Sequence, residues 1–297
     1  MIKFYKNYQI DKIKWDNCIV NSVNYLPYAL SWYLDIVSKN WNALVLGDYE
    51  AVFPLPSNFF FIHYSLNPFW IQQLGIFSRS EKNLNKVNDF IEAIPKYYKL
   101  VNLNINYANI CSSNFIKKTN CILNLNDDYK KIKQFYSKNL KRNLKKHKFV
   151  KKNIVFNCSP KIIINLFKNN NKYKFENHDY QNLQLLMEKS FEKSVGQIIL
   201  CKDENNVPLA GVFLLHTSTR IIFLFSGNTE FGRKNGLIPF LLDLVIQKNS
   251  NSNKIFDFEG SNNNNLLRFY RSFGAKVQPY YNIKINKLPF FLKLLYK

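Results

Sequence analysis

Cysteine and histidine are scarce in this chain, and their spacing excludes two classes of protein. Among 297 residues there are five cysteines and four histidines. The cysteines are odd in number, widely scattered and form no CxxC pair, which argues against a disulfide framework and against a zinc site. The histidines show no HExxH or other ligand spacing. We therefore expect no bound metal, and reduced cysteines that pack in the core.

Long apolar runs are also missing. The chain starts with MIKFYKNYQIDKIKWDN, which is positively charged but holds no apolar run of signal-peptide length. Nowhere do the roughly 18 apolar residues of a membrane-spanning helix follow one another. The sequence therefore predicts no integral membrane segment and a cytoplasmic location. At 46% apolar content the chain can bury one large core or two ordinary ones.

Acidic residues are few, and the formal net charge is +22. Such an excess of Lys and Arg is typical of proteins that bind polyanions, because cationic side chains gain affinity for phosphates by releasing counterions. The chain is also crowded with Lys, Asn, Ile, Phe and Tyr, whose codons are rich in A and T. Part of the charge therefore follows from genome composition, and only its local distribution can indicate a binding site.

The densest cationic segment is Lys138 to Lys152, with eight Lys or Arg in fifteen residues. Ile132, Tyr136, Leu140 and Leu144 recur every four residues before and within it, which predicts an amphipathic helix with a cationic face. A solvated helix face between two halves is the favoured interpretation, and a phosphate site is the alternative. The tail KLPFFLKLLYK offers a further alternative, peripheral membrane contact, although a packed terminal helix or strand is the simpler interpretation.

Two comparable halves are predicted, 1–126 and 127–297. The first is expected to contain a helix around Leu26 to Ser38, a hairpin of Asn42 to Leu46 and Ala51 to Leu55, a strand in Trp70 to Phe77, a helix from Glu81 to Ile94 and a strand from Leu100 to Ile105. The second repeats the theme with helices near Pro160 to Phe167 and Tyr180 to Phe191, followed by strands at Gln197 to Cys201, Leu209 to Leu215 and Arg220 to Ser226.

The segment KIFDFEGSNNNNLLRFYRSFGA, residues 254–275, combines a strand, a turn and a helix. Phe256 and Phe258 alternate with Asp257 and Glu259, which places an apolar and an acidic pair on opposite faces of a strand. The asparagines provide turn and capping groups. Apolar residues then follow at helical spacing until Gly274 ends the run.

This segment resembles a known superfamily. Asn263, Leu266, Phe269, Tyr270 and Gly274 match the last strand and helix of the GCN5-related N-acetyltransferases (GNAT), although Ala275 stands where those enzymes usually have Phe. The strings FDFEGS and RFYRSFGA are more similar to the bacterial FemAB-like and BioF2-like branch. Blocks such as LSWYLDIVSKNWNALVL, VFPLP, IQQLGIFS and YSKNLKRNLKK extend the resemblance over nearly the whole chain.

The resemblance implies an α/β (α+β) fold of tandem GNAT-type halves, each a mixed, mostly antiparallel sheet with helices on both faces. It implies an N-acyltransferase that moves an acyl group from acyl-CoA to a small amine. A FemAB-like transferase that uses aminoacyl-tRNA and acts on a cell-wall precursor is one alternative. A catalytically silent basic module that binds RNA or another polyanion is the other.

Acyl transfer needs a general base, because an amine must be neutral to attack while a lysine-like amine has a pKa of about 10.4. Glu259 is the leading candidate and Asp257 the next, since ligands bind at the carboxyl ends of strands in open sheets. Both could instead cap a helix or pair with Arg268 or Arg271. Tyr270 occupies the position at which many GNAT enzymes keep a proton donor, and it could equally be an aromatic plug.

The donor phosphates are expected at FSGNTEFGRKNGLIPF, where a strand ends and a helix starts near Gly236. Gly227, Arg233, Lys234, Asn235 and Gly236 are the candidate cofactor-binding residues. Arg233 and Gly236 fit the GNAT pattern, whereas the bulky Ile238 replaces a small residue. The resemblance further implies that Arg142 and Lys145 contact anionic groups, and Arg268 completes the expected anion site.

Overall fold

The computed structural model describes residues 1–110, 115–146, 153–169, 175–289 and 293. It divides into two compact units, one of 1–118 together with 279–297 and one of 119–278. The predicted boundary near residue 126 differs from this division, because the C-terminal segment belongs with the N-terminal residues. None of the helices in these residues is both long and apolar enough to cross a bilayer.

The first unit contains an antiparallel sheet in the order β1-β2-β3-β6. Its strands are Ile2–Tyr5, Asn42–Leu46, Ala51–Leu55 and Phe77–Ser78. The predicted hairpin is confirmed, since β2 and β3 pair from Asn42↔Leu55 to Leu46↔Ala51. Helix α1 (Lys12–Val20), which starts where the Asp11 side chain accepts from two backbone amides, packs against β3 and β6.

A second set of strands in this unit has the order β4-β5-β7-β14. These are Asn58–Phe60, Ile62–Leu66, Tyr98–Ile105 and Lys276–Asn286. Strand β7 pairs in parallel with β5 and antiparallel with β14, from Tyr281↔Ile105 to Asn286↔Leu100. The side chain of Ile283 is buried in the same core as Phe53 and Phe90. These contacts explain why the end of the chain joins the first unit.

The predicted strand Trp70 to Phe77 is wrong for most of its length. Within it, Leu74 forms an isolated bridge with Ile105, Phe77 pairs with Val52 at the start of β6, and Gly75 adopts a positive φ of +94°. The predicted helix from Glu81 to Ile94 is two short helices, α3 (Glu81–Leu84) and α4 (Val87–Glu92). The helix expected around Leu26 to Ser38 is confirmed in part as a 3₁₀ turn followed by α2 (Ser31–Val37).

The second unit is built on strands in the order β8-β13-β12-β11-β10-β9. These strands are Ile116–Asn124, Ile255–Gly260, Arg220–Asn228, Pro208–His216, Gly196–Lys202 and Asn153–Phe156. Only the pair β12 and β13 is parallel among the strand pairs described in this unit. The helices are α5 (Tyr129–Gln134), α6 (Lys138–Lys146), α7 (Pro160–Lys168), α8 (Asn177–Glu192), α9 (Glu230–Lys234), α10 (Leu237–Asn249) and α11 (Asn264–Arg271).

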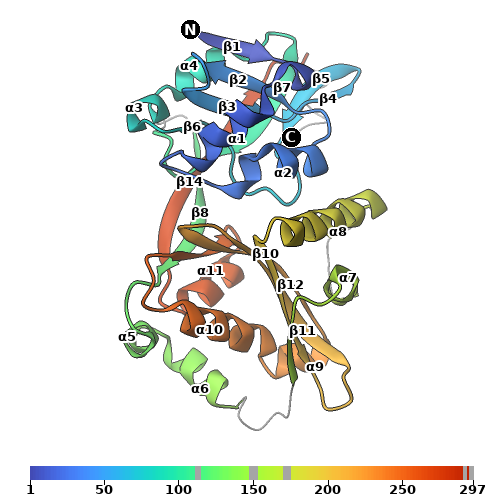
Figure 1. Ribbon diagram of the computed structural model, residues 1–297, viewed down its shortest axis with the longest axis vertical. Helices are drawn as coiled ribbons and strands as arrows, with labels where there is room; N and C mark the ends of the chain where they lie inside the picture. Colours follow the sequence, from blue (N-terminus) through green and yellow to red (C-terminus); the bar gives the residue numbers. More distant parts are fainter. Residues whose placement is uncertain (111–114, 147–152, 170–174, 290–292, 294–297) are drawn as a thin grey trace. The chain divides into compact units, whose positions relative to one another are not determined.

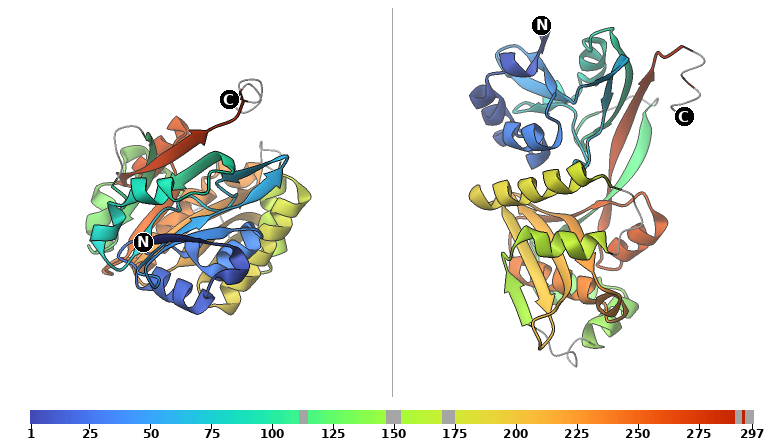
Figure 2. Two further views of the ribbon diagram at one scale, coloured as in Figure 1. Left: turned by 90° about the horizontal axis from the view of Figure 1, so that it is seen from above. Right: turned by 90° about the vertical axis from the view of Figure 1, so that its right-hand side faces the viewer.

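Helices cover both faces of this sheet (Figures 1 and 2). Val212 and Leu214 of β11 share a core with Leu241 of α10, whereas Gly211 lies against Ile163 of α7. Because alternate residues of a strand point to opposite faces, α7 and α10 lie on opposite sides. The mixed, mostly antiparallel sheet with helices on both faces confirms the predicted fold class.

The predicted amphipathic helix is two helices, α5 and α6. Ile132, Tyr136, Leu140 and Leu144 are buried, as their spacing indicated. The helix is interrupted at Ser137, whose amide donates to the carbonyl of Ser272 and whose hydroxyl accepts from the amide of Leu140. Residues 147–152 of the cationic segment, and most of the C-terminal tail, lie outside the described residues.

Candidate active site

Asp257 forms a buried ion pair at the centre of the second unit. Its carboxylate accepts from Arg220 at 2.6 Å and from the side-chain amide of Asn120 at 2.8 Å. Arg220 and Asp257 are 3% and 1% exposed. Phe256 and Phe258 belong to the core beneath α10 and α11, so Asp257 faces the other side of the sheet. These are the contacts of a structural carboxylate, and its role as a base stays a prediction.

The pairing of the two central strands is short. Strands β12 and β13 pair from Arg220↔Ile255 to Ile222↔Asp257, whereas β12 continues its pairing with β11 as far as Asn228. Beyond Ile222 and Asp257 the register of this parallel pair ends. The candidate catalytic residues of β13 follow directly after this point.

Glu259 has an unusual backbone conformation at the end of β13. Its φ is +58°, in the left-handed region that residues other than Gly, Asn and Asp rarely adopt. The register with β8 shifts between Asp257 and Gly260. The amide of Glu259 donates to Asp257 Oδ1 at 3.0 Å, and its carbonyl accepts from the Ser261 hydroxyl at 2.8 Å. The Arg220–Asp257 pair therefore holds the turn that presents the half-buried Glu259.

Tyr270 projects from α11 into an aromatic cluster. Its ring centroid is 5.0 Å from that of Phe258, 5.4 Å from that of Phe269 and 6.4 Å from that of Phe223. Burial, and then the negative charge of Glu259, raise the pKa of its phenol. Tyr270 therefore keeps its proton at neutral pH, and the raised pKa makes its phenol a weaker acid than that of an exposed tyrosine. The ring packing also supports the aromatic-plug interpretation.

Four residues near this site had not been predicted, namely Asn120, Cys121, Arg220 and Ser261. Burial raises the pKa of the Cys121 thiol, and the hydrogen bond with Ser261 opposes this effect. Arg220 offered a signal, since it is a lone cation at the start of an apolar strand. The other three have partners far away in the chain, and no motif in the sequence around them indicates a functional site.

The predicted donor loop has few amides left for an anion. The backbone amides of Arg233, Asn235 and Gly236 donate to the carbonyls of Thr229, Phe231 and Arg233. Gly236 has a positive φ of +63° at the start of α10, as a phosphate turn requires, but the side chain of Ile238 is buried. The Lys234 ammonium lies 3.0 Å from the carboxylate of Glu230.

Close packing of α7 against the sheet explains why residue 227 is a glycine. A Cβ atom at this position would lie 2.6 Å from Cβ of Leu166 and 2.8 Å from the carbonyl oxygen of Ile163. The missing side chain lets α7 approach the sheet closely. The close approach at Gly227 is thus to a helix of this unit, and its donor-binding role stays a prediction.

A cleft of ≈ 690 Å³ lies between α6, α11 and the first turn of α10. The residues that line it include two arginines, Arg268 and Arg271, and four asparagines, Asn139, Asn143, Asn264 and Asn265. Arg142, on α6, donates to Asn139 Oδ1 at 2.8 Å. The structure thus brings Arg268 beside the basic helix, while Arg142 and Lys145 are exposed and do not line the cleft.

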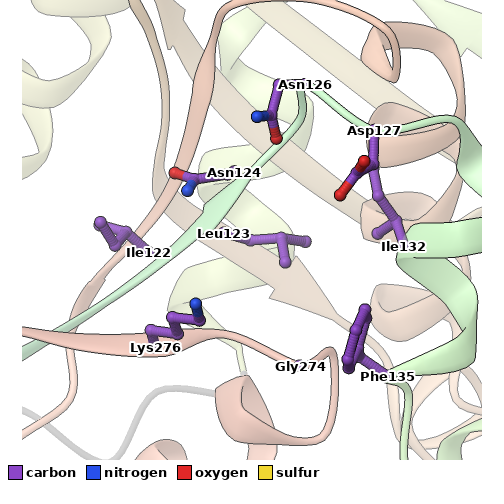
Figure 3. A pocket seen from close by; sticks show the side chains of 9 residues that line it. All are labelled: Ile122, Leu123, Asn124, Asn126, Asp127, Ile132, Phe135, Gly274 and Lys276. Atoms are coloured by element: carbon purple, nitrogen blue, oxygen red, sulfur yellow. The ribbon is translucent and has the colours of Figure 1, made fainter.

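A smaller pocket of ≈ 300 Å³ lies beside the end of β8 (Figure 3). Leu123, Ile132 and Phe135 give it apolar walls, and Asn126, Asp127 and Lys276 bring polar groups to it. The carboxylate of Asp127 is 2.6 Å from the Lys131 ammonium. None of the predicted site residues lines this pocket.

The predicted residues thus fall into three groups. Glu259 and Tyr270 lie close enough for charge to couple them, and Asp257 supports the turn beneath Glu259. Arg268 lies in the cleft, on the same helix as Tyr270. Gly227 and the segment of Arg233 to Gly236 lie near the carboxyl end of β12 and in the connection to α10. Because β12 and β13 are parallel, this is the same edge of the sheet at which Glu259 ends β13. Within the described residues, no group of His, Cys, Asp and Glu side chains could hold a metal ion.

Comparison with known proteins shows the fold. No family model matches the chain, and no curated protein matches it. The structure of FemX has a TM-score of 0.67 at 10% identity, over 96% of this chain and 98% of that one. A C-terminal domain assigned to a lysylphosphatidylglycerol synthetase from Agrobacterium fabrum has a TM-score of 0.59 at 11% identity, over 96% and 94% of the two chains.

A tandem GNAT protein from the clavulanic acid biosynthesis pathway has a TM-score of 0.51 at 8% identity, over 97% of this chain and all of that chain, 100%. At these identities the likeness concerns the arrangement of the elements alone. Together with the sheet order and the helices on both faces, it shows that the chain has a GNAT-like fold.

Proposed function

We propose that this protein is a transferase that moves an acyl or aminoacyl group from a phosphate-bearing donor to an amine. The cleft between α6 and α11 carries the proposal, because it places Arg268 and Arg271 beside a cationic helix. Guanidinium groups bind phosphate oxygens in pairs of hydrogen bonds, and the polar asparagines of the cleft suit a ribose or a base. The candidate proton donor Tyr270 lies on the same helix, α11.

Between the two donors, the geometry favours one carried on RNA over coenzyme A. Three of the amides expected to cradle a pyrophosphate already donate to carbonyls of the chain, and Ile238 fills the place of a small residue. The positive φ of Gly236 is the feature that supports coenzyme A. The cationic face of α6, in contrast, is typical of a surface that follows a polynucleotide backbone.

The chemistry assigned to the residues follows from their protonation. The neutral amine attacks the acyl carbonyl, a C–N bond forms, and Glu259 accepts the proton that the amine loses. The bond from the carbonyl carbon to the donor oxygen or sulfur then breaks, and the Tyr270 hydroxyl supplies a proton to the departing atom. Asp257 acts as a positioning residue, because it holds the amide of Glu259 and is itself held by Arg220.

The acceptor is proposed on general grounds as a small amine or a cell-wall precursor that carries one. The Agrobacterium domain belongs to a protein named for lysylphosphatidylglycerol, a lipid that joins a lysyl group to phosphatidylglycerol. The likeness to that domain supports an aminoacyl donor. A membrane-bound acceptor and a soluble one would use the same donor cleft.

Binding of the donor tests the proposal. We expect tRNA to bind the full chain with an affinity that falls as salt rises, and Arg268→Glu and Arg271→Glu each to weaken it by about tenfold or more. Lys161→Glu on α7 is the matched control, since it makes the same charge change on the opposite face of the sheet. Coenzyme A, measured in parallel by calorimetry, should bind more weakly than tRNA. Stronger binding of coenzyme A, lost in Arg233→Glu, would reverse the choice of donor.

Transfer of the group tests the catalytic residues. With aminoacyl-tRNA carrying a labelled amino acid and a panel of amines, Glu259→Gln should lower kcat by about 10² or more while tRNA binding stays unchanged. Tyr270→Phe should do the same without changing the melting temperature much. The silent binding module predicts the opposite pattern, namely salt-sensitive RNA binding with no transfer by the parent protein.

A further inference from the structure

Three consecutive phenylalanines are exposed at one hairpin of the first unit. Phe59, Phe60 and Phe61 have 68%, 63% and 85% of their surface open to solvent. They lie in the hairpin of β4 and β5, and β4 is the edge strand of its sheet (Figure 1). We propose that this hairpin inserts its tip into the headgroup region of an anionic lipid bilayer. The proposal is independent of the transferase assignment.

The tip is unfavourable in water for two separate reasons. Phe60 pairs with Ile62, so Phe61 stands alone at the turn with a φ of +58°. A bulky residue in the left-handed region is strained, and Gly or Asn is the usual choice there. Exposed aromatic surface adds a second cost. Backbone strain and exposed aromatic surface at the same residue indicate that the Phe61 side chain inserts into an apolar environment.

The aromatic surface continues behind the tip with more polar rings. The ring centroids of Phe59 and His63 are 4.9 Å apart, and those of His63 and Tyr97 are 4.8 Å apart. Tyr97 is 43% exposed. Tyrosine rings prefer the interface between membrane and water, because one end is apolar and the other forms hydrogen bonds. Apolar rings at the tip and a tyrosine behind them form the order expected for shallow insertion.

Lysines lie at the same end of the sheet. The parallel pairing of His63 with Tyr98 brings Lys96 and Lys99 beside the hairpin. The amide of Lys287 donates to the carbonyl of Lys99, so a third lysine, directly after the end of β14, joins them. All three side chains are exposed. Glu92, at the end of α4, is the nearest acid along the chain before Lys96. This charge favours an anionic surface, and the phenylalanines favour a bilayer over a soluble polyanion.

Vesicle sedimentation with the full chain tests the insertion. We expect binding to vesicles of equal parts phosphatidylglycerol and phosphatidylcholine, and a loss of about tenfold per residue in Phe60→Ser and Phe61→Asn. Asparagine tolerates the positive φ, so the second variant should fold at least as well as the parent, which thermal melting checks. Ile13→Ser is the matched control, because Ile13 is 83% exposed in α1 of the same unit; its binding should equal that of the parent.

The lysines are tested on the same vesicles. Lys96→Ser and Lys99→Ser should each lower binding to the anionic vesicles by about fivefold, and neither should change binding to pure phosphatidylcholine. The proposal of membrane insertion is contradicted if the parent protein does not bind anionic vesicles. It is also overturned if the lysine variants lose binding while the phenylalanine variants keep it, since that result describes adsorption by charge alone.

Discussion

Arg220 and Asp257 form an ion pair that is almost completely removed from water. Removing two charges from water costs several kcal/mol per ion, and their attraction offsets this cost only when further hydrogen bonds complete the geometry. Here the side-chain amide of Asn120 and the backbone amide of Glu259 donate hydrogen bonds to the Asp257 carboxylate. Gln278 accepts a further hydrogen bond from Arg220 at 3.3 Å. The pair therefore fixes where β13 turns.

Breaking this pair from one side should be costly. Arg220→Met leaves an uncompensated carboxylate in the core, so we expect a loss of about 3–5 kcal/mol in the free energy of unfolding. The double variant Arg220→Met, Asp257→Leu removes both charges and should recover part of that loss. Urea unfolding followed by fluorescence measures both.

The exposed pair of Lys14 and Asp48 is the control for this experiment, at 2.7 Å and with side-chain exposures of 49% and 75%. Lys14→Met should change the free energy of unfolding much less than Arg220→Met, because an exposed ion pair is screened by water and contributes little. A double variant at Arg220 and Asp257 that is as unstable as the single one would show that packing, and not the buried charge, accounts for the loss.

His216 should make the stability depend on pH. Burial, and then the charge of Lys254, lower the pKa of its imidazole to about 4, and its Nε2 lies 3.1 Å from Gln197 Oε1. The unfolded chain, with a histidine pKa of about 6.5, therefore binds the proton first as pH falls. The contribution of His216 is complete above pH 6.5 and is lost as pH falls toward 4.

We expect this loss to be about 1–2 kcal/mol, since the side chain is only partly buried. Urea unfolding at pH 7, 5.5 and 4 for the parent and for His216→Gln measures it, because all other groups titrate equally in the two proteins. Parallel pH profiles for the two proteins would disprove the role of His216.

At the scale of elements, the packing of α7 on β12 depends on Gly227. An added methyl group would meet Leu166 and the backbone of α7 at less than 3 Å, so either the helix or the strand must move. We expect Gly227→Ala to lower the free energy of unfolding by about 1–3 kcal/mol. Gly260→Ala is the matched control, since its Cβ would meet nothing within 4 Å. Equal stability of the two variants would contradict this packing argument.

Local patterns predicted the elements whose signals are local. The strand at residues 255–260 and the helix after Asn263 are confirmed, because alternation, a capping asparagine and a terminal glycine all lie within a few residues of one another. The side chain of Asn263 accepts from the amides of Asn265 and Leu266, and Gly274 has a φ of +77°. Each of these sequence signals determines the conformation of residues close to it in the chain, so it can be recognised without knowledge of the fold.

The segment of residues 70–77 was mistaken for a strand because it is apolar and buried. Its polar atoms are instead satisfied by side chains of a distant loop, since Asn106 Nδ2 donates to the carbonyls of Leu74 and Ile76, and Ile76 donates to Asn109 Oδ1. Strand β14 was missed for a related reason. It contains Pro279 and many polar residues, and its pairing partner β7 lies far away in the chain.

In the candidate site, too, the residues with local signals could be predicted and the long-range contacts could not. The acidic residues of β13 and Tyr270 could be named from their own segment, but Arg220 could not be matched to Asp257, 37 positions away. The cleft between α6 and α11 was not predictable either, because it forms only when two helices from distant parts of the sequence lie together. Residue type is visible in a sequence, whereas partners at long range are not.

At the scale of the whole molecule, the first unit needs the end of the chain. A fragment of residues 1–126 would lack β14 and leave one side of β7 unpaired, with Ile283 absent from the core. We expect this fragment to be largely unfolded at 25 °C, because unpaired strands and missing core side chains remove several kcal/mol. Fusing residues 279–297 to it through a flexible linker should restore a cooperative thermal transition in circular dichroism.

The second unit provides the comparison for this experiment. Residues 119–278 contain all of the pairing described for β9 to β13. We expect this fragment to melt cooperatively by itself. A fragment of residues 1–126 that melts at the same temperature as its fused version would show that β14 is dispensable.

The place of β14 also sets the order in which the protein can fold as it is made. Residues 279–286 leave the ribosome only after all of residues 119–278, so the later unit can close while the earlier one still waits for its last strand. Domains usually fold in the order of their synthesis, from the N-terminus. The position of β14 predicts the reverse order here, with one side of β7 left unpaired until the last strand is made.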